Sequence, residues 1–250
     1  IVEKIESPTS VYIGIMKVNG LTLDIDLMDQ YSKKAETEMT RLREEIRLII
    51  GGVNIGKGGT TNKLKEYLFK DKNLPVVKTT EKGEPALDEE ALTLLQEYCE
   101  SGKANREQSA LLPLFPLLCE YRSWVKIHRT YIEGYKKHIN SATGRIHPEM
   151  LSLSTKTGRM SCNSPNVQNM PRKDNDPVGV RKFISAPQGY CYIAADQSQI
   201  ELRVGAFYCC DPEMLRIYRS DGDIHALTTS IIFGISLKEA ADKHNPRYKE

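Results

Sequence analysis

The sequence lacks the features typical of membrane, secreted or zinc-stabilised proteins. No apolar run approaches the ~20 residues that a membrane-spanning helix requires, and the first residues lack the basic-then-apolar layout of a signal peptide. None of the six cysteines shows CxxC spacing, and Cys209 and Cys210 are adjacent, which suits neither a disulfide nor a tetrahedral zinc site. We therefore expect reduced, mostly buried thiols in a cytoplasmic protein. The chain also lacks an initiator Met, so we expect it to be cut from a longer protein.

A large net charge is also absent, since the 250 residues carry a formal charge of only +2. The charge is nevertheless uneven. Residues 121–182 hold twelve Lys and Arg side chains against four Asp and Glu, a net +8 that leaves −6 for the remainder. A basic surface on a near-neutral chain is typical of a phosphate-binding face, and charge alone leaves a solvated lysine-rich surface open as the alternative.

Apolar periodicity predicts several helices in the first half. A short strand is expected over 21–26, and a long amphipathic helix follows, with apolar residues in steps of three and four over 28–49. The Gly-rich stretch 51–61 ends this helix and lacks the G-x-x-x-x-G-K-[ST] spacing of a phosphate loop, so we interpret it as a flexible tip. Further helices are expected over 63–69, 88–99 and 120–139, the last with an apolar stripe beside a basic one.

The second half indicates mixed structure. Residues 190–195 predict a short buried strand that ends at Asp196, followed by a helix from Ser198. The buried positions of this helix are expected to be Ile200, Val204 and Phe207. Later helices are predicted from their N-terminal caps, namely Asp211, Asp223 and the pair Ser236 and Glu239, with a stop at Asn245–Pro246.

Asp196 is a candidate metal ligand because a carboxylate at the end of a strand faces the crevice where substrates usually bind. Hard oxygen ligands of this kind suit Mg²⁺, particularly where substrate phosphates complete the shell. An isolated Asp at this position caps a helix more often than it binds a metal. Whether Asp196 is a metal ligand therefore has to be judged from the neighbouring residues.

Several long strings of the sequence resemble motifs of family A DNA polymerases, the family of bacterial DNA polymerase I. The string DQSQIELR from Asp196 to Arg203 is similar to motif A of that family. The other strings occur in the family's order: M-x-x-x-G-x-x-x-D over 16–24, Y-R…K…T-Y over 121–131, T-G-R-M-S over 157–161, P-N-V-Q-N-M-P over 165–171 and G-D-I-H over 222–225. The resemblance spans nearly the whole chain.

The resemblance implies DNA-directed DNA synthesis with two Mg²⁺ ions in the complete enzyme. Asp196 would be one of two catalytic aspartates, and Gln197 would offer its backbone carbonyl to a metal ion. The family usually has Tyr where this chain has Gln197. Glu201 would lie under the incoming sugar and exclude a 2′-hydroxyl. The remaining candidate contacts to the incoming nucleotide are Ser198, Gln199 and His225.

The resemblance also implies a set of contacts to primer-template DNA. Arg159 would reach the minor-groove edge of the primer terminus, which checks shape without reading sequence. Sugar and base contacts are expected from Asn166, Gln168 and Asn169, and phosphate contacts from Arg122, Lys126, Thr130, Thr155 and Arg181. Contacts to phosphates are independent of the DNA sequence and sensitive to salt. Arg203 is a further candidate DNA contact, with a structural ion pair as the alternative.

The expected fold is α+β and helix-rich, a partial right-hand polymerase. We expect an opening palm segment over 1–26, a thumb over 27–120, a palm with motif A over 121–205 and the start of the fingers over 206–250. The fingers helix that binds the triphosphate and the second catalytic aspartate do not occur before Glu250, so we expect the chain alone to be inactive. The expected partners are primer-template DNA and dNTPs, with no membrane, in a monomer from the cytoplasm of a bacterial or phage-infected cell.

Two other functions remain as alternatives. A single-subunit RNA polymerase shares the architecture, but the position of Glu201 would then have to admit a 2′-hydroxyl. A non-catalytic module that binds primer-template DNA is the alternative outside enzymes.

Overall fold

The computed structural model describes residues 4, 7–152, 154–171, 176, 178–220 and 222–242. The chain divides into two compact units, Ile1–Cys191 and Tyr192–Glu250, and each is considered by itself. In the described part of the chain, no helix is both long enough and apolar enough to span a membrane. The predicted stop at Asn245–Pro246 lies outside the described residues.

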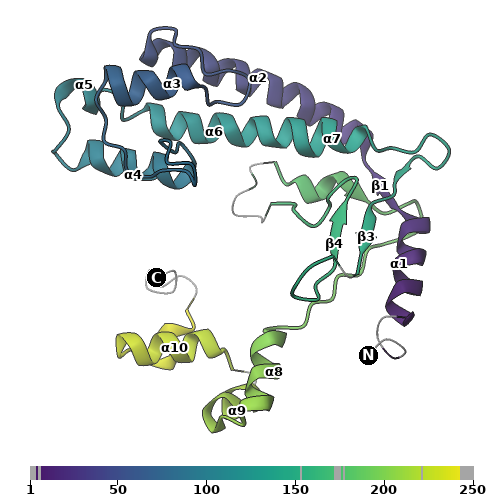
Figure 1. Ribbon diagram of the computed structural model, residues 1–250. Coiled ribbons are helices and arrows are strands. Elements are labelled where there is room, and N and C mark those ends of the chain that lie inside the picture. Colours follow the sequence, from purple (N-terminus) through teal and green to yellow (C-terminus); the bar gives the residue numbers. More distant parts are fainter. Residues whose placement is uncertain are drawn as a thin grey trace. The chain divides into compact units, whose positions relative to one another are not determined.

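The first unit is built around a long antiparallel pairing of helices (Figure 1). Helix α2 (Ile25–Ile50) packs along α6 (Leu114–Lys126), the π-helical segment η3 (Ile127–Ile132) and α7 (Glu133–Lys136). The buried residues of α2 recur at helical spacing and form one stripe: Met28, Ala35, Leu42, Ile46 and Ile50. The predicted long helix is thus confirmed, and its partner along the stripe is the basic helix.

Shorter helices complete this helical layer. They are α3 (Asn62–Glu66), the π-helical segment η2 (Tyr67–Asp71), α4 (Glu89–Glu100) and α5 (Arg106–Ser109). The chain can begin α6 between two prolines, because Pro113 lies before the helix and Pro116 in its first turn, where no backbone N–H is needed. The helix predicted over 120–139 therefore begins earlier than expected.

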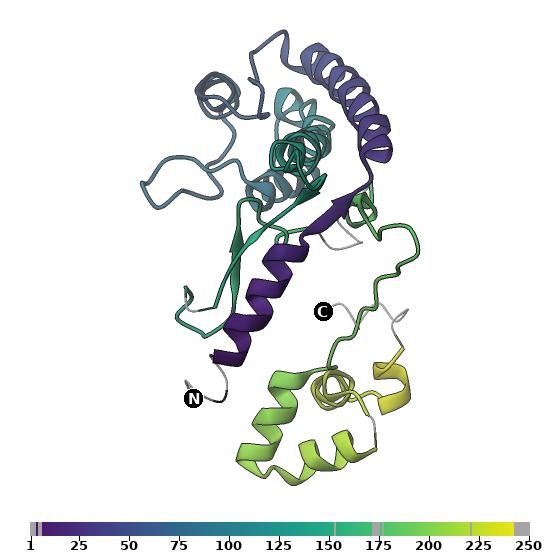
Figure 2. The same ribbon diagram turned by 90° about the vertical axis from the view of Figure 1, so that its right-hand side faces the viewer.

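Two small sheets lie beside the helices. Strand β1 (Leu21–Leu23) is central in an antiparallel sheet with β2 (Arg145–Ile146) and β5 (Ile184–Ser185), and Leu21 pairs with Ile146. Figure 2 shows α1 (Ser7–Asn19) leading through β1 into α2. The remaining elements are the antiparallel pair β3 (Glu149–Leu151) and β4 (Ser161–Asn163) and the 3-10 turn η5 (Val180–Phe183).

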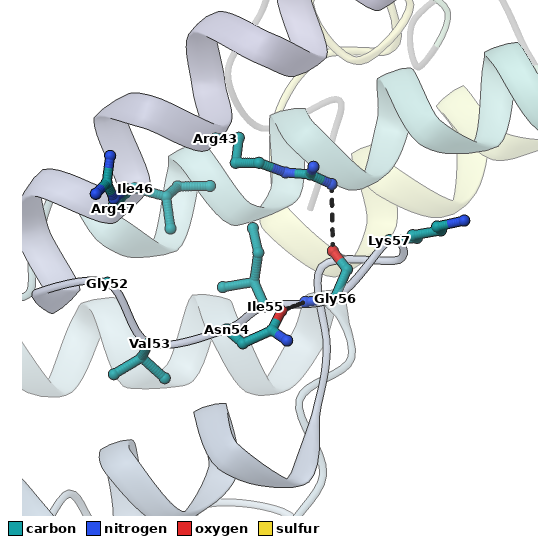
Figure 3. A pocket seen from close by; sticks show the side chains of 9 residues that line it. All are labelled: Arg43, Ile46, Arg47, Gly52, Val53, Asn54, Ile55, Gly56 and Lys57. Atoms are coloured by element: carbon teal, nitrogen blue, oxygen red, sulfur yellow. Dashed lines mark hydrogen bonds between the residues drawn. The ribbon is translucent and has the colours of Figure 1, made fainter.

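The Gly-rich stretch after α2 is held by two arginines. Arg43 Nη2 donates to the Gly56 carbonyl oxygen at 3.5 Å (Figure 3). Arg122 donates to the Gly59 carbonyl oxygen through Nη2 at 2.9 Å and through Nε at 3.2 Å. The loop is therefore fastened at two of its carbonyls, and the flexibility predicted for this tip stays a prediction. The loop and the end of α2 together line a pocket of about 370 Å³. Its basic lining residues are Arg43, Arg47 and Lys57, and its aliphatic ones are Ile46, Val53 and Ile55.

The second unit consists of short helices: α8 (Ile200–Cys209), α9 (Pro212–Arg219), α10 (Ile224–Phe233) and α11 (Leu237–Ala240). Its small buried cluster is Ala206, Tyr218 and Ile224. The predicted caps are confirmed, because Asp211 accepts from the Met214 N–H, Asp223 from the His225 N–H, and Ser236 and Glu239 cap each other's backbone.

Three expectations about buried segments are wrong. Residues 190–195 form no strand and are exposed, because no strand in the described part of the chain lies beside them to complete their backbone hydrogen bonds. Of the α8 positions expected to be buried, Ile200 and Val204 are each 45% exposed and Phe207 is 72% exposed. Among the thiols only Cys99 and Cys162 are buried, whereas Cys191, Cys209 and Cys210 are exposed.

Candidate functional site

The motif A residues lie at the start of α8 in the second unit. Asp196, Gln197 and Ser198 are exposed and precede the helix, and Glu201 is exposed in its first turn. Gln199 is the N-terminal cap of α8 and has left-handed backbone angles, φ 54° and ψ 36°. A non-glycine residue in this region costs about 1 kcal/mol, so other contacts must hold it there.

The Gln199 side chain supplies such a contact. Its Nε2 donates to Asp223 Oδ1 at 2.9 Å, and the same oxygen accepts the backbone N–H of His225 at 2.8 Å. Burial raises the pKa of Asp223, but the N–H groups of Gln199, His225 and Ala226 outweigh it and hold the pKa below its ordinary value. The structure therefore brings two predicted positions, Gln199 and His225, to one shared carboxylate. Glu201 lies two residues beyond Gln199 in the first turn of α8.

Arg203 is engaged within the second unit. Its Nε donates to the Ser198 carbonyl oxygen at 2.9 Å, and its guanidinium carbon lies 4.6 Å from the centre of the Tyr218 ring. The cation–π contact also fixes α8 against α9. These contacts give Arg203 a structural role, and its predicted DNA contact stays a prediction.

In the first unit, Arg122 also binds protein groups. Besides the Gly59 carbonyl oxygen, it donates through Nη1 to the Leu87 carbonyl oxygen. Burial lowers the pKa of the guanidinium from its ordinary value. By contrast, Lys126 and Thr130 are exposed on the same helix. The phosphate contact predicted for Arg122 stays a prediction, and its observed partners are backbone carbonyls.

Two buried tyrosines hold the turn that contains the predicted sugar and base contacts. Tyr135 Oη donates to the Asn166 carbonyl oxygen at 3.1 Å, and Tyr131 Oη donates to the Asn169 carbonyl oxygen at 2.6 Å. Within the turn, Asn166 Oδ1 accepts the backbone N–H groups of Gln168 and Asn169 at 3.0 and 3.2 Å. Gln168 and Asn169 are thereby left exposed on a fixed backbone.

The remaining predicted DNA contacts of the first unit are Thr155, Arg159 and Arg181. Thr155 Oγ1 donates to the Arg159 carbonyl oxygen at 2.5 Å, which closes the loop before β4. The Arg159 side chain is exposed. Arg181 is exposed on η5, and its Nε reaches the Pro171 carbonyl oxygen at 3.4 Å.

Tyr131, Tyr135 and Asp223 contribute to the site in ways that their sequence positions do not reveal. The tyrosines fit the apolar stripe of their helix, and Asp223 fits an ordinary helix cap. The i, i+4 spacing of the tyrosines shows that they share a helix face. It does not show which carbonyls their hydroxyls meet, because the turn at 166–169 lies more than 30 residues further along the chain.

The donor set for a metal ion is incomplete within the described residues. They contain no group of three or more His, Cys, Asp or Glu side chains that would surround an ion. Asp196 and the Gln197 carbonyl are hard oxygen donors of the type that Mg²⁺ takes. They fit a part of such a site, and further oxygen donors are needed to complete it.

The architecture has a close counterpart among solved structures. The matched structure is described as the POL domain of Pol1 from M. smegmatis in complex with DNA primer-template and dNTP. It aligns with a TM-score of 0.80 at 24% identity, over 98% of this chain and 41% of that chain. The fold is thus a helix-rich part of a polymerase domain.

The sequence comparisons name the family. The model of DNA polymerase family A matches residues 25–250, and the chain belongs to this family. DNA polymerase I of Caldicellulosiruptor bescii is 31% identical over 248 residues, which are 99% of this chain and 27% of that protein. Thermostable DNA polymerase I of Thermus filiformis is 32% identical over 242 residues, 93% of this chain and 26% of that protein. The chain thus spans about a quarter of the length of these relatives.

Proposed function

We propose that this chain is the part of a DNA-directed DNA polymerase that grips the primer-template junction and contributes one catalytic carboxylate. The observation that carries the proposal is the motif A string, which lies at the start of α8 with Asp196 and Glu201 both exposed, in a chain of this family. The relatives that span the chain are DNA polymerases I, and the matched structure was solved with primer-template and dNTP.

The residues of the second unit would receive the incoming dNTP. Glu201 would exclude a 2′-hydroxyl by its bulk, and His225 would contact the triphosphate. Asp196 and the Gln197 carbonyl would hold Mg²⁺, which lowers the pKa of a primer 3′-hydroxyl and stabilises the leaving pyrophosphate when it is bound. Since these two groups are only part of a metal site, we propose that the 250 residues by themselves bind DNA without extending it.

The residues of the first unit would hold the DNA. Lys126 and Thr130 present exposed side chains for phosphates, and Arg159 is exposed for the groove. The turn at 166–169 presents Gln168 and Asn169 from a backbone that two tyrosines fasten. This arrangement supports binding that depends on the shape of the junction and on salt.

A salt-dependent binding titration tests the proposal. The chain is titrated with a primer-template junction and with blunt duplex, and the Arg159→Ala variant is compared with Lys103→Ala. Lys103 is exposed and lies outside the proposed DNA-binding residues, so both variants lose one positive charge. We expect salt-sensitive binding that prefers the junction, a loss of about 1–3 kcal/mol for Arg159→Ala and little change for Lys103→Ala.

Two results would contradict the proposal. Equal losses for the two variants would mean that Arg159 contributes only its charge. Primer extension with Mg²⁺ and dNTPs on the same samples would show that the 250 residues hold a working site.

A further inference from the structure

The N-terminus of α8 and the N-terminus of α10 are joined by a side-chain hydrogen bond. Gln199 Nε2 donates to Asp223 Oδ1 at 2.9 Å across 24 residues of sequence. Gln199 occupies the N-cap position of α8 without a side-chain capping bond, and Asp223 caps α10 through its carboxylate. The bond therefore connects the points at which the two helices begin.

The Gln199 backbone is strained, and the side-chain hydrogen bond to Asp223 helps to hold it. Its left-handed conformation, φ 54° and ψ 36°, is disfavoured for a residue with a Cβ atom. Because the side chain is half-buried and bonded to Asp223, the amide is turned toward the protein. Glu201, two residues further on, is exposed in the first turn of α8.

The Asp223 carboxylate is fixed by the hydrogen bonds that it accepts. Its Oδ1 accepts from the Gln199 amide and from the His225 backbone N–H at 2.8 Å. The exposed His225 side chain thus follows directly from a residue whose own carboxylate is fixed from α8. A second contact steadies α8, since Arg203 lies 4.6 Å over the Tyr218 ring of α9.

We propose that Gln199 and Asp223 are positioning residues, whose hydrogen bond sets the place of His225 relative to Glu201. The inference rests on the proposed function, in which these two exposed side chains meet the triphosphate and the sugar of one nucleotide. Gln199 acts through the carboxylate of Asp223 and not by contact with the nucleotide. The pair differs in this from Asp196, which precedes α8 and is exposed.

A reversal of the hydrogen bond separates positioning from direct contact. The Gln199→Glu variant places two carboxylates together and breaks the bond. Adding Asp223→Asn offers a bond of opposite polarity, in which the Asn Nδ2 donates to the Glu carboxylate. In the wild type one oxygen, Oδ1, accepts both bonds, so the Asn side chain must rotate for its own oxygen to accept the His225 N–H. Gln96→Glu on α4 is the matched control for the added charge, because the half-buried Gln96 amide likewise donates to a carboxylate, that of Glu100.

The measurement is solution NMR on the 250-residue chain. Proton–proton NOEs from the residue 199 side chain to the amides of 224–226 report the pair without nucleotide. Titration with dATP and Mg²⁺, followed at the His225 and Glu201 amides, reports binding. We expect Gln199→Glu to lose the NOEs and to weaken dATP binding by roughly tenfold, and the double variant to recover both to within about twofold.

Three results would overturn the inference: NOEs that persist in Gln199→Glu, a double variant that recovers neither measure, or an equal loss of binding in Gln96→Glu. The failure of the proposed function has a different signature. A wild-type chain whose His225 and Glu201 amides do not respond to dATP contradicts the nucleotide site, while loss and recovery of the NOEs still establish the link between the helices.

Discussion

Replacing Tyr135 by Phe removes one hydroxyl from a buried ring and leaves the ring in place. The hydroxyl donates to the Asn166 carbonyl oxygen at 3.1 Å, and Tyr135 is only 1% exposed. No cavity larger than one oxygen atom is created, so the cost is that of a hydrogen bond and an unsatisfied carbonyl. We expect a loss of about 1 kcal/mol in the free energy of unfolding. For a chain of this size that corresponds to about 2–4 °C in Tm.

The same substitution should also weaken binding of the primer-template junction. The turn at 166–169 would then keep one of its two tyrosine hydrogen bonds, that of Tyr131, whose hydroxyl donates to the Asn169 carbonyl oxygen at 2.6 Å. If the whole ~1 kcal/mol is lost from the bound state, the Kd rises about fivefold. The assays are thermal unfolding followed by circular dichroism and fluorescence anisotropy with a labelled junction.

Tyr12→Phe is the matched control, because Tyr12 is 68% exposed on α1 and lies outside the turn. We expect neither its Tm nor its Kd to change. Tyr131→Phe should resemble Tyr135→Phe, and the double variant should lose less than the sum because both hydroxyls hold one turn. If Tyr135→Phe and Tyr12→Phe behave alike in both assays, the tyrosines do not fasten the DNA-binding turn.

Three further predictions concern the same unit. Arg122→Lys keeps the charge but removes the three guanidinium donors that bind backbone carbonyls, so we expect the free energy of unfolding in urea to fall by about 2 kcal/mol. A variant as stable as wild type would contradict this. Gly59→Ala should cost about 1–2 kcal/mol in the same assay, because φ is +75° and the new Cβ would lie 2.9 Å from Arg122 Cγ, whereas Gly58→Ala has open space and should be close to neutral. Burial raises the pKa of Tyr131 and of Tyr135 above the ordinary value, so their contribution to stability is complete below about pH 10, the unfolded pKa, and is lost as pH rises further. Unfolding at pH 9 and pH 10.5 should therefore show a smaller drop for the double Phe variant than for wild type, and equal drops would refute the assignment.

Local rules explain which elements the sequence predicts well. A helix cap depends on a side chain and a backbone N–H two or three residues away, so Asp211 and Asp223 are readable from the sequence. The α2 stripe is equally local, since it needs only the helical period. These features do not depend on what lies opposite them.

The errors concern features that depend on distant neighbours. Residues 190–195 have strand composition, but a strand forms only where another strand completes its hydrogen bonds. Phe207 has the spacing of a buried position and is 72% exposed, because burial also requires a surface to pack against. The Gln199–Asp223 bond and the tyrosine contacts could not be predicted for the same reason, as each joins residues 24 or more positions apart.

The two tyrosines hold the turn at 166–169 by its main chain alone. Both hydroxyls bind carbonyl oxygens, and every amino acid supplies a carbonyl oxygen at that place. These two hydrogen bonds therefore do not depend on the side chains that the turn exposes. Gln168 and Asn169 can change in evolution or by design, altering what the turn recognises, while its position on the helix is inherited unchanged.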